Sequence, residues 1–242
     1  LTQSFRCPNP VAEMANRYLR VAGATKPFHG NGEPPKRQRP SVPAFLARSN
    51  ALIFLESFFA VSKGRRPYFL GGFDGYNFDI ILDIANAKLG NWGKIRNRFI
   101  LDYFTNYQEM LEYAKTDQLF LSRLNIAEQY GKKVFAMYED IRQNTAGSVQ
   151  SAGEIFSTAH KAKGAEWKSV TLGNDFLSLK STLSKMGNSS KPVTVRKEEL
   201  NLLYVASTRS KATLAVPKEV ALSDKAAASL VAAETSGRLL LM

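Results

Sequence analysis

One long segment, residues 74–143, has helical periodicity and interrupts a chain that otherwise alternates between short apolar runs and helices. Its apolar residues recur with the spacing of amphipathic helices, whereas the flanking runs are short and continuous, as in buried strands. Alternating strands and helices form parallel sheets covered by helices, and a long helical stretch adds no strand to such a sheet. The sequence therefore predicts an α/β fold, a parallel sheet flanked by helices, interrupted by a mostly helical insertion.

The expected elements lie on both sides of the insertion. The strand candidates are residues 44–47, 67–70, 155–158, 169–172 and 212–216. A helix is expected to start near Asn9, with Asn9 as the capping residue and Pro10 at the first helical position. Further helices are expected at 51–59 and 198–210. We expect one discontinuous domain, residues 1–73 and 149–242, and a helical accessory insertion at 74–148.

The chain is basic, with 33 Lys and Arg residues against 21 Asp and Glu, a net charge of +12 and a pI near 9.8. This balance favours a polyanionic partner such as nucleic acid, although charge alone does not establish one. The single cysteine, Cys7, leaves no disulfide framework or Cys-based zinc site within the chain.

No apolar run approaches the ~18–20 residues that span a bilayer, and the amino terminus has no signal-peptide pattern. We expect no membrane partner. The expected location is intracellular, in the cytoplasm if the protein is bacterial and in the nucleus if it is eukaryotic.

Three segments place charged residues at the end of an apolar strand or along a helix. They are LTQSFR at 1–6, STAHKAKGAEW at 157–167 and EELNLLYVASTRSK at 198–211. Loops at the carboxyl ends of parallel strands converge on a common crevice, where ligands bind. We therefore expect Arg6 and the loop from His160 to Glu166 to share one site.

In their order along the chain and in their amino-acid sequence, these segments resemble the fourth, fifth and sixth motifs of UvrD/Rep-like superfamily-one DNA helicases. Residues 44–50, AFLARSN, resemble the Arg-Ser-Asn element of that family. The specific part is T-x-H-x-x-K-G-x-E-W followed by E-E-x-x-L-L-Y-V-A-x-T-R-x-K. Residues 1–6 and 174–176 are similar to the F-box-type DNA helicase branch. The resemblance implies the carboxy-terminal half of such a motor, with a second RecA-like domain and an accessory insertion.

The resemblance also implies an ATP site. Phe5 would stack on adenine, and Arg6 and Arg209 would be the catalytic arginines that reach the γ-phosphate. An arginine suits this role because its planar fork meets phosphate oxygens in pairs and stays charged. Glu166 would accept a hydrogen bond from the ribose, and Gly164 would let the backbone approach its neighbours closely.

A DNA site is implied as well. Arg48, Asn50, Thr158 and His160 would hold the phosphates of single-stranded DNA without reading its sequence. The implied partners are single-stranded DNA and duplex junctions, with translocation from 3′ to 5′. Two features depart from the family: Ala165 stands where leucine is usual, and no Gly-x-Phe-Pro element follows the fifth motif.

Each of these residue types also has a common structural role. Arginines are most often on the surface or in ion pairs, and histidines are most often structural or exposed. The combined pattern favours the functional interpretation for Arg6, Glu166 and Arg209, and leaves both interpretations open for the DNA-contact residues. Glu198 and Glu199 are expected in the first turn of a helix, where the macrodipole favours negative charge, and we assign them no chemistry.

The sequence contains no G-x-x-x-x-G-K-[ST] loop, and no Gly-Lys is followed by Ser or Thr. Because such motors need this loop, we expect ATP and Mg²⁺ to be bound mainly by a missing amino-terminal RecA-like domain. The start at Leu1 agrees with a chain cut from a longer one, and we expect the fragment alone not to hydrolyse ATP. No metal ligands are assigned here. Two alternatives stay open: a degenerate RecA-like module that holds DNA or a protein without turnover, and an interaction scaffold in a repair complex.

Overall fold

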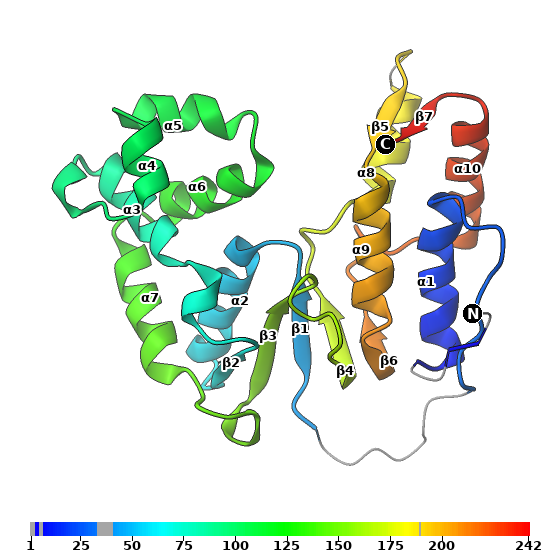
Figure 1. The fold of residues 1–242 in the computed structure, drawn as a ribbon, viewed down its shortest axis with the longest axis horizontal. Coiled ribbons are helices and arrows are strands. Elements are labelled where there is room, and N and C mark those ends of the chain that lie inside the picture. The colour runs from blue at the N-terminus through cyan, green and yellow to red at the C-terminus, as the bar shows by residue number, and fades with distance from the viewer. Residues whose placement is uncertain (1–2, 5–6, 33–40, 189) are drawn as a thin grey trace. The chain divides into compact units, whose positions relative to one another are not determined.

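The computed structural model describes residues 3–4, 7–32, 41–188 and 190–242 (Figure 1). The chain forms two compact units, which we call unit 1 (Leu1–Arg48 and Ser157–Met242) and unit 2 (Ser49–Phe156). The strands of the larger sheet follow the order β2-β3-β1-β4-β6. The predicted class, α/β with a parallel sheet flanked by helices, is confirmed and is consistent with a RecA-like fold. Compact units are not the same as domains, so the domain boundaries at 74 and 148 remain a prediction.

The sheet strands of unit 1 are short, apolar and parallel. Their bounds are β1 (Ala44–Ala47), β4 (Trp167–Leu172) and β6 (Ser210–Ala215). Ala44 pairs with Val170 of β4, and Val170 pairs with Leu214 of β6. All four residues of β1 are buried, as expected for a strand covered on both faces. β3 (Glu154–Thr158) runs from unit 2 into unit 1, and its last four residues are buried.

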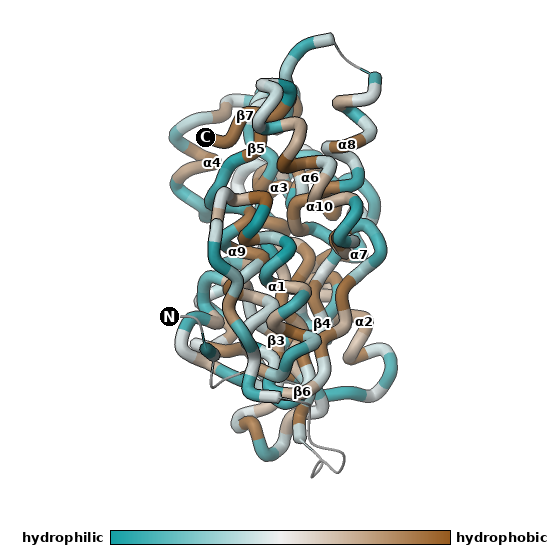
Figure 2. The backbone as a smooth tube through the Cα atoms, turned by 90° about the vertical axis from the view of Figure 1, so that its right-hand side faces the viewer, coloured by the Kyte–Doolittle hydropathy of each residue, from teal (hydrophilic) through white to brown (hydrophobic). Residues whose placement is uncertain are grey.

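Helices α1 (Asn9–Val21), α9 (Lys197–Ser207) and α10 (Asp224–Thr235) belong to unit 1, and α1 packs against the other two (Figure 1). Every buried residue of α1 is apolar or aromatic, and most recur three or four positions apart: Val11, Ala12, Ala15, Tyr18 and Val21. This spacing places them on one face of the helix. Figure 2 shows the corresponding alternation of hydrophobic and hydrophilic segments along the chain.

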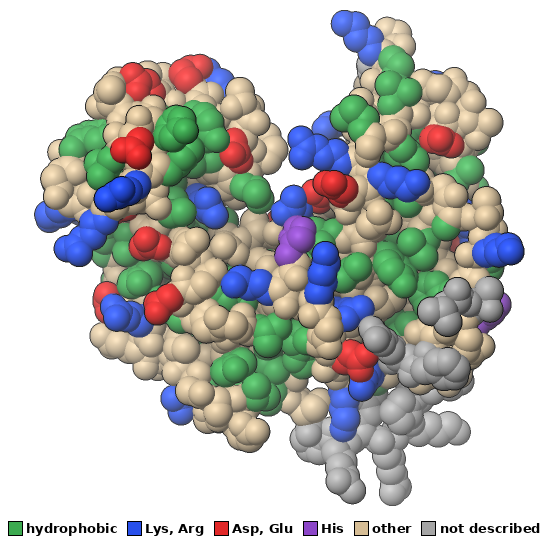
Figure 3. All heavy atoms as spheres, in the orientation of Figure 1, with side chains coloured by type: hydrophobic (Ala, Val, Ile, Leu, Met, Phe, Trp, Pro, Cys, Tyr) green, Lys and Arg blue, Asp and Glu red, His purple; other side chains and the backbone are tan. Residues whose placement is uncertain are grey.

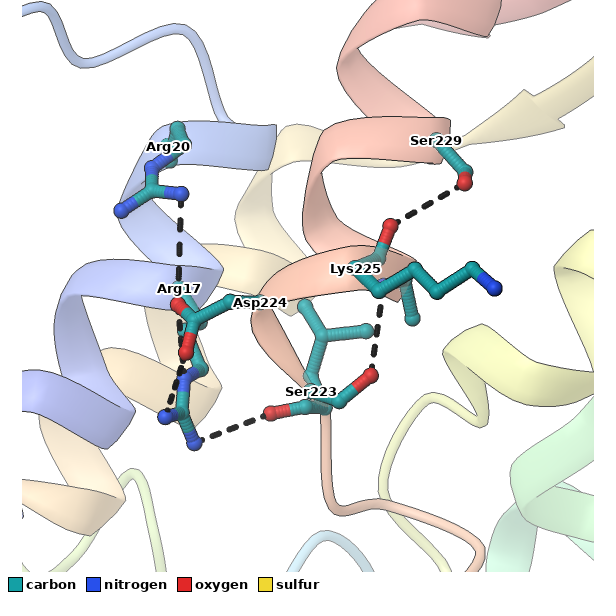
Figure 4. Close-up of polar contacts among 8 residues, drawn as sticks. Arg17, Arg20, Ser223, Asp224, Lys225 and Ser229 are labelled. Carbon is teal, nitrogen blue, oxygen red and sulfur yellow. Dashed lines mark hydrogen bonds and ion pairs between the residues drawn. The ribbon is translucent and has the colours of Figure 1, made fainter.

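Polar contacts join the end of α1 to the start of α10 (Figure 4). Arg17 donates to both carboxylate oxygens of Asp224, from Nε at 3.1 Å and from Nη2 at 2.8 Å. Its Nη1 donates to the carbonyl oxygen of Leu222 at 3.3 Å. The hydrogen bond from Arg17 lowers the pKa of Asp224. Ser223 Oγ accepts from the amide of Ala226 and so caps α10.

The rest of unit 1 comprises α8 (Leu179–Gly187) and a two-stranded parallel sheet of β5 (Val193–Val195) and β7 (Leu239–Leu241). Apart from the strands and helices, one close backbone approach constrains the start of the chain. A Cβ atom at Gly30 would lie 2.5 Å from the carbonyl carbon of Pro8, so this position requires glycine.

Unit 2 is mostly helical. Its elements are α2 (Asn50–Ser62), β2 (Pro67–Phe69), η1 (Asp74–Tyr76), α3 (Asp79–Lys88), η2 (Trp92–Lys94), α4 (Arg98–Tyr103), α5 (Tyr107–Ala114), α6 (Gln118–Tyr130), α7 (Lys133–Asn144) and η3 (Val149–Ser151). Side-chain caps start several helices, for example Ser49 Oγ on α2 and Asp117 on α6. Aromatic rings form much of the core, and Phe69 packs edge-on against both Tyr76 and Phe78.

The expected strands and the helical stretch from 74 to 143 are confirmed to within a few residues. The expected cap of α1 is wrong: Asn9 is already helical, Pro8 is the capping residue, and no side chain caps the helix. Among the described residues, no helix has the length and apolar character needed to cross a membrane.

Candidate functional site

On the face that Figure 3 draws, basic and acidic side chains are mixed. Figure 3 shows Lys and Arg side chains spread over the visible face, with Asp and Glu side chains among them. A net charge of +12 therefore does not locate a site, and the site has to be built from particular residues.

Polar residues of unit 1 collect at both ends of its parallel strands. The carboxyl-edge cluster, Arg48, Thr158, His160 and Glu199, lies where β1 and β3 end and α9 begins. The amino-edge cluster, Glu166, Arg209 and Lys211, lies where β4 and β6 begin. Because β1, β4 and β6 are parallel, the two clusters lie at opposite edges of the sheet.

An ion pair between Arg48 and Glu199 dominates the carboxyl-edge cluster. Arg48 Nε donates to both oxygens of Glu199 at 3.0 and 2.9 Å, and Nη2 donates to Oε1 at 2.8 Å. The two side chains are 23% and 21% exposed, and the hydrogen bonds raise the pKa of Arg48. The backbone amide of Arg48 also donates to Asp175 Oδ1 at 2.9 Å. Arg48, expected to bind DNA, is thus held and neutralised within the chain.

Thr158 supports the turn that follows β3. Its side chain is buried, and Oγ1 accepts from the amide of Lys161 at 3.4 Å. The next residue, Ala159, donates its amide to the carbonyl oxygen of Ala47 at 2.9 Å, which joins the turn to the end of β1. The structure therefore gives the Thr158 hydroxyl a structural partner, and its contact with DNA remains a prediction.

His160 is the exposed member of the carboxyl-edge cluster. Partial burial of the ring and the positive charges of Arg48 and Lys163 lower the pKa of His160, while Glu199 and Glu198 oppose this shift. This shift favours the neutral form of the ring, which can donate one hydrogen bond and accept another.

Asn50, also expected to face DNA, belongs to unit 2. Its Nδ2 donates to the carbonyl oxygen of Tyr76 at 2.9 Å, which fixes the turn before α3. This bond gives the side chain a structural role within its own unit, and its contact with DNA remains a prediction.

The amino-edge cluster is organised around Arg209, which is only 8% exposed. Its Nε donates to the carbonyl oxygen of Val205 at 2.9 Å, Nη1 to that of Ala165 at 3.3 Å, and Nη2 to Thr208 Oγ1 at 3.4 Å. These three acceptors are neutral oxygens, and their hydrogen bonds orient the guanidinium. Its positive charge also acts on the buried thiol of Cys7, whose pKa is nonetheless raised by burial.

Glu166 and Lys211 form an ion pair across neighbouring strands. Lys211 Nζ lies 2.5 Å from Glu166 Oε2, and the side chains are 51% and 21% exposed. The amide of Trp167 donates to the carbonyl oxygen of Arg209 at 3.0 Å. Together these contacts bind the start of β4 to the start of β6, which places Glu166 beside Arg209.

The loop from His160 to Glu166 does not stay at the carboxyl edge, and its sharing of a site with Arg6 remains a prediction because Arg6 lies outside the described residues. The loop leaves the carboxyl edge after Thr158 and reaches the amino edge before Trp167, because β3 and β4 are joined without a helix. Gly164, within this loop, has φ +87, and a Cβ there would meet no atom within 4 Å. Backbone conformation rather than close approach within the chain therefore explains this glycine.

Two expected ATP residues, Phe5 and Arg6, lie outside the described residues. One residue of the site was missed: Glu199 was expected only in the first turn of a helix, which is confirmed, yet it also binds Arg48. No pattern near Glu199 indicates a partner 151 residues away. Among the described residues, no group of three or more His, Cys, Asp or Glu side chains could hold a metal ion.

Two curated proteins are similar to this chain over most of its length. F-box DNA helicase protein 1 of Schizosaccharomyces pombe is 27% identical, over 88% of this chain and 26% of that protein. F-box DNA helicase 1 of Gallus gallus is 25% identical, over 88% of this chain and 23% of that protein. The chain resembles F-box DNA helicases. It spans about a quarter of the length of these relatives, and no family model matches it.

Proposed function

We propose that this chain is the carboxy-terminal part of an ATP-dependent DNA helicase that moves along single-stranded DNA from 3′ to 5′ and unwinds duplex. The observation that supports this most is the meeting, within unit 1, of segments far apart in sequence that resemble helicase motifs. Arg48 binds Glu199 at one edge, and Arg209 binds Ala165 at the other. Two edges with separate cations provide two places for phosphate groups.

The amino edge is the proposed nucleotide side. The residues present suit a triphosphate, because three hydrogen bonds orient the guanidinium of Arg209, whose planar fork can meet phosphate oxygens in pairs. In this proposal Arg209 and Arg6 neutralise charge that develops on the γ-phosphate. Phe5 stacks on the base. Glu166 leaves its ion pair with Lys211 and accepts a hydrogen bond from a ribose hydroxyl. ATP with Mg²⁺ supplies the phosphoryl group and the metal charge, held mainly by an amino-terminal RecA-like domain. This chain alone then has no ATPase activity.

The carboxyl edge is the proposed single-stranded DNA side. Arg48 and Lys163 lie close enough to His160 for their charges to lower its pKa, after the larger effect of burial. Charged and neutral donors of this kind bind phosphates without reading bases, so binding should tolerate any sequence. Closure of the two RecA-like domains around ATP would then move the DNA held at this edge.

The first test is ATP hydrolysis by the longer helicase with and without single-stranded DNA. Arg209→Ala should reduce turnover by about 10³-fold, because it removes the guanidinium from the transferring phosphoryl group. Arg238→Ala is the matched control: Arg238, also in unit 1, likewise donates to a backbone carbonyl, that of Met186. Equal turnover in both variants would favour the alternative of a RecA-like module that binds DNA or protein without catalysis.

A further inference from the structure

A surface pocket of about 400 Å³ lies within unit 2. Its walls come from the end of α3, the η2 turn and the start of α7. The lining residues are Asn86, Leu89, Asn91, Lys94, Lys132 and Phe135. Ligand pockets begin at about 300 Å³, so this one has room for a single small molecule or one unit of a polymer.

Two lysines line this pocket without an acidic partner. Lys94 and Lys132 are exposed, and no carboxylate of the described residues lies within ion-pair distance of either one. Other lysines of unit 2 are paired, for example Lys88 with Glu128 at 2.9 Å and Lys115 with Glu112 at 2.6 Å. The pocket therefore carries uncompensated positive charge.

The helix that forms one wall adds to this charge. Lys132 is the capping residue of α7, Lys133 is its first residue, and its first turn contains no acidic side chain. The amino terminus of a helix is itself positive, so each cation there is unfavourable. Two lysines at this end conflict with ordinary helix preferences, and an anion in the pocket would relieve the conflict.

A buried amide points to the same pocket. Asn86 is 7% exposed, and its side chain has no hydrogen-bond partner in the described part of the chain. Ser207 Oγ is the one described side-chain polar atom that is fully enclosed without a partner, so the amide of Asn86 keeps access to solvent. The pocket is an opening that Asn86 lines. A carboxamide both donates and accepts, as the edge of a nucleobase requires.

We propose that this pocket binds one nucleotide of a single-stranded nucleic acid. The phosphate lies near Lys94, Lys132 and the amino terminus of α7, and the base packs on Phe135 with its edge toward Asn86. Stacking on an aromatic ring together with lysine contacts to phosphate is the usual chemistry of single-strand binding. The proposal rests on residues of unit 2 alone and does not depend on the ATP or DNA roles proposed for unit 1.

Protein NMR tests this with three probes: deoxyadenosine monophosphate, inorganic phosphate and an acidic peptide. The nucleotide should shift the amide signals of residues 86–94 and 132–135, with at least about tenfold tighter binding than phosphate, or ~1.4 kcal/mol. Absence of nucleotide shifts at these residues overturns the proposal. Equal binding of inorganic phosphate, or tighter binding of the peptide, also overturns it, in favour of a simple anion site or a protein partner.

The variants separate charge from stacking. Lys94→Gln with Lys132→Gln should weaken nucleotide binding by about tenfold, whereas Lys63→Gln with Lys115→Gln, which removes the same charge elsewhere in unit 2, should change it by less than about twofold. Phe135→Leu should weaken nucleotide but not phosphate binding. Thermal melting checks that each variant folds, and equal binding by the pocket and control pairs contradicts the proposal.

Failure of the pocket proposal can be distinguished from failure of the helicase proposal, because the two are measured at different residues. Arg48→Ala should leave nucleotide shifts at the pocket unchanged, since Arg48 belongs to unit 1. If Arg209→Ala leaves ATP turnover intact while the pocket still binds nucleotide, the helicase proposal fails and the pocket proposal stands. If Arg209→Ala abolishes ATP turnover while the pocket binds no nucleotide, the pocket proposal fails and the helicase proposal stands.

Discussion

Arg48 and Arg209 lie at opposite edges of the same sheet and are held in different ways. A carboxylate binds Arg48 through two nitrogen atoms, whereas neutral oxygens of Val205, Ala165 and Thr208 accept from Arg209. A carboxylate orients an arginine and also compensates its charge, whereas a carbonyl or hydroxyl oxygen orients it through a hydrogen bond alone. Three hydrogen bonds to neutral oxygens hold the guanidinium of Arg209 in one orientation, whereas Arg48 must leave Glu199 before it can bind a phosphate.

The largest expected effect tests the orientation of Arg209. Arg209→Lys keeps the charge but loses the planar fork, so we expect ATP turnover of the longer helicase to fall by at least about 100-fold. Affinity for single-stranded DNA should stay within about twofold, because the proposed DNA side is the opposite edge. Steady-state turnover and fluorescence anisotropy measure the two quantities. Near-normal turnover in this variant would show that charge alone suffices and would weaken the contrast with Arg48.

The loop between the two edges should give the next largest effect. Gly164→Ala places a side chain at φ +87, which should lower the free energy of unfolding by about 1–2 kcal/mol. Gly187→Ala is the matched control in unit 1, since a Cβ there also meets nothing within 4 Å and the backbone is helical. Chemical denaturation of both variants measures the difference. Equal stability would mean that the loop adapts and does not fix the two edges relative to each other.

Releasing Arg48 from Glu199 should have a smaller effect, and it should raise an affinity rather than lower an activity or a stability. Glu199→Gln removes the cancelling charge, so affinity for single-stranded DNA should rise about threefold, equivalent to ~0.7 kcal/mol for a partly exposed pair. Glu198→Gln changes the net charge equally and is the control. The gain should disappear in an Arg48→Ala background. If both glutamate variants gain equally, general charge rather than the Arg48 pair sets the affinity.

The smallest expected effect is in the titration of His160. Its folded pKa lies below the ordinary value of about 6.5, so the folded state takes up fewer protons than the unfolded state below that pH. The free energy of unfolding should therefore fall as the pH drops from about 7 toward 5. The His160→Gln variant should lose less free energy of unfolding over this pH range than the unaltered protein. NMR titration should show the His160 pKa rising in Arg48→Ala. An unchanged His160 pKa in the Arg48→Ala variant would mean that the charge of Arg48 does not act on His160.

Local sequence patterns predicted elements wherever apolar residues formed clear runs. Residues 44–47 became β1 because all four are apolar and buried, and Ser49 caps the helix that follows. Patterns failed where the signal was weak. α10 is rich in alanine, whose small side chain marks no face strongly, and β5 and β7 are three residues each.

The sequence by itself determined the α/β class, the order of the five strands of the larger sheet along the chain, and the likeness to DNA helicases, because these depend on local periodicity and on the residues of the motifs. Only the tertiary structure decided that Glu199 neutralises Arg48, that the loop after Thr158 crosses from one edge to the other, and that Asn86, Lys94 and Lys132 line one pocket. These are contacts between distant segments, and a hydrogen bond or ion pair depends on where side chains meet in space rather than on neighbours in the chain.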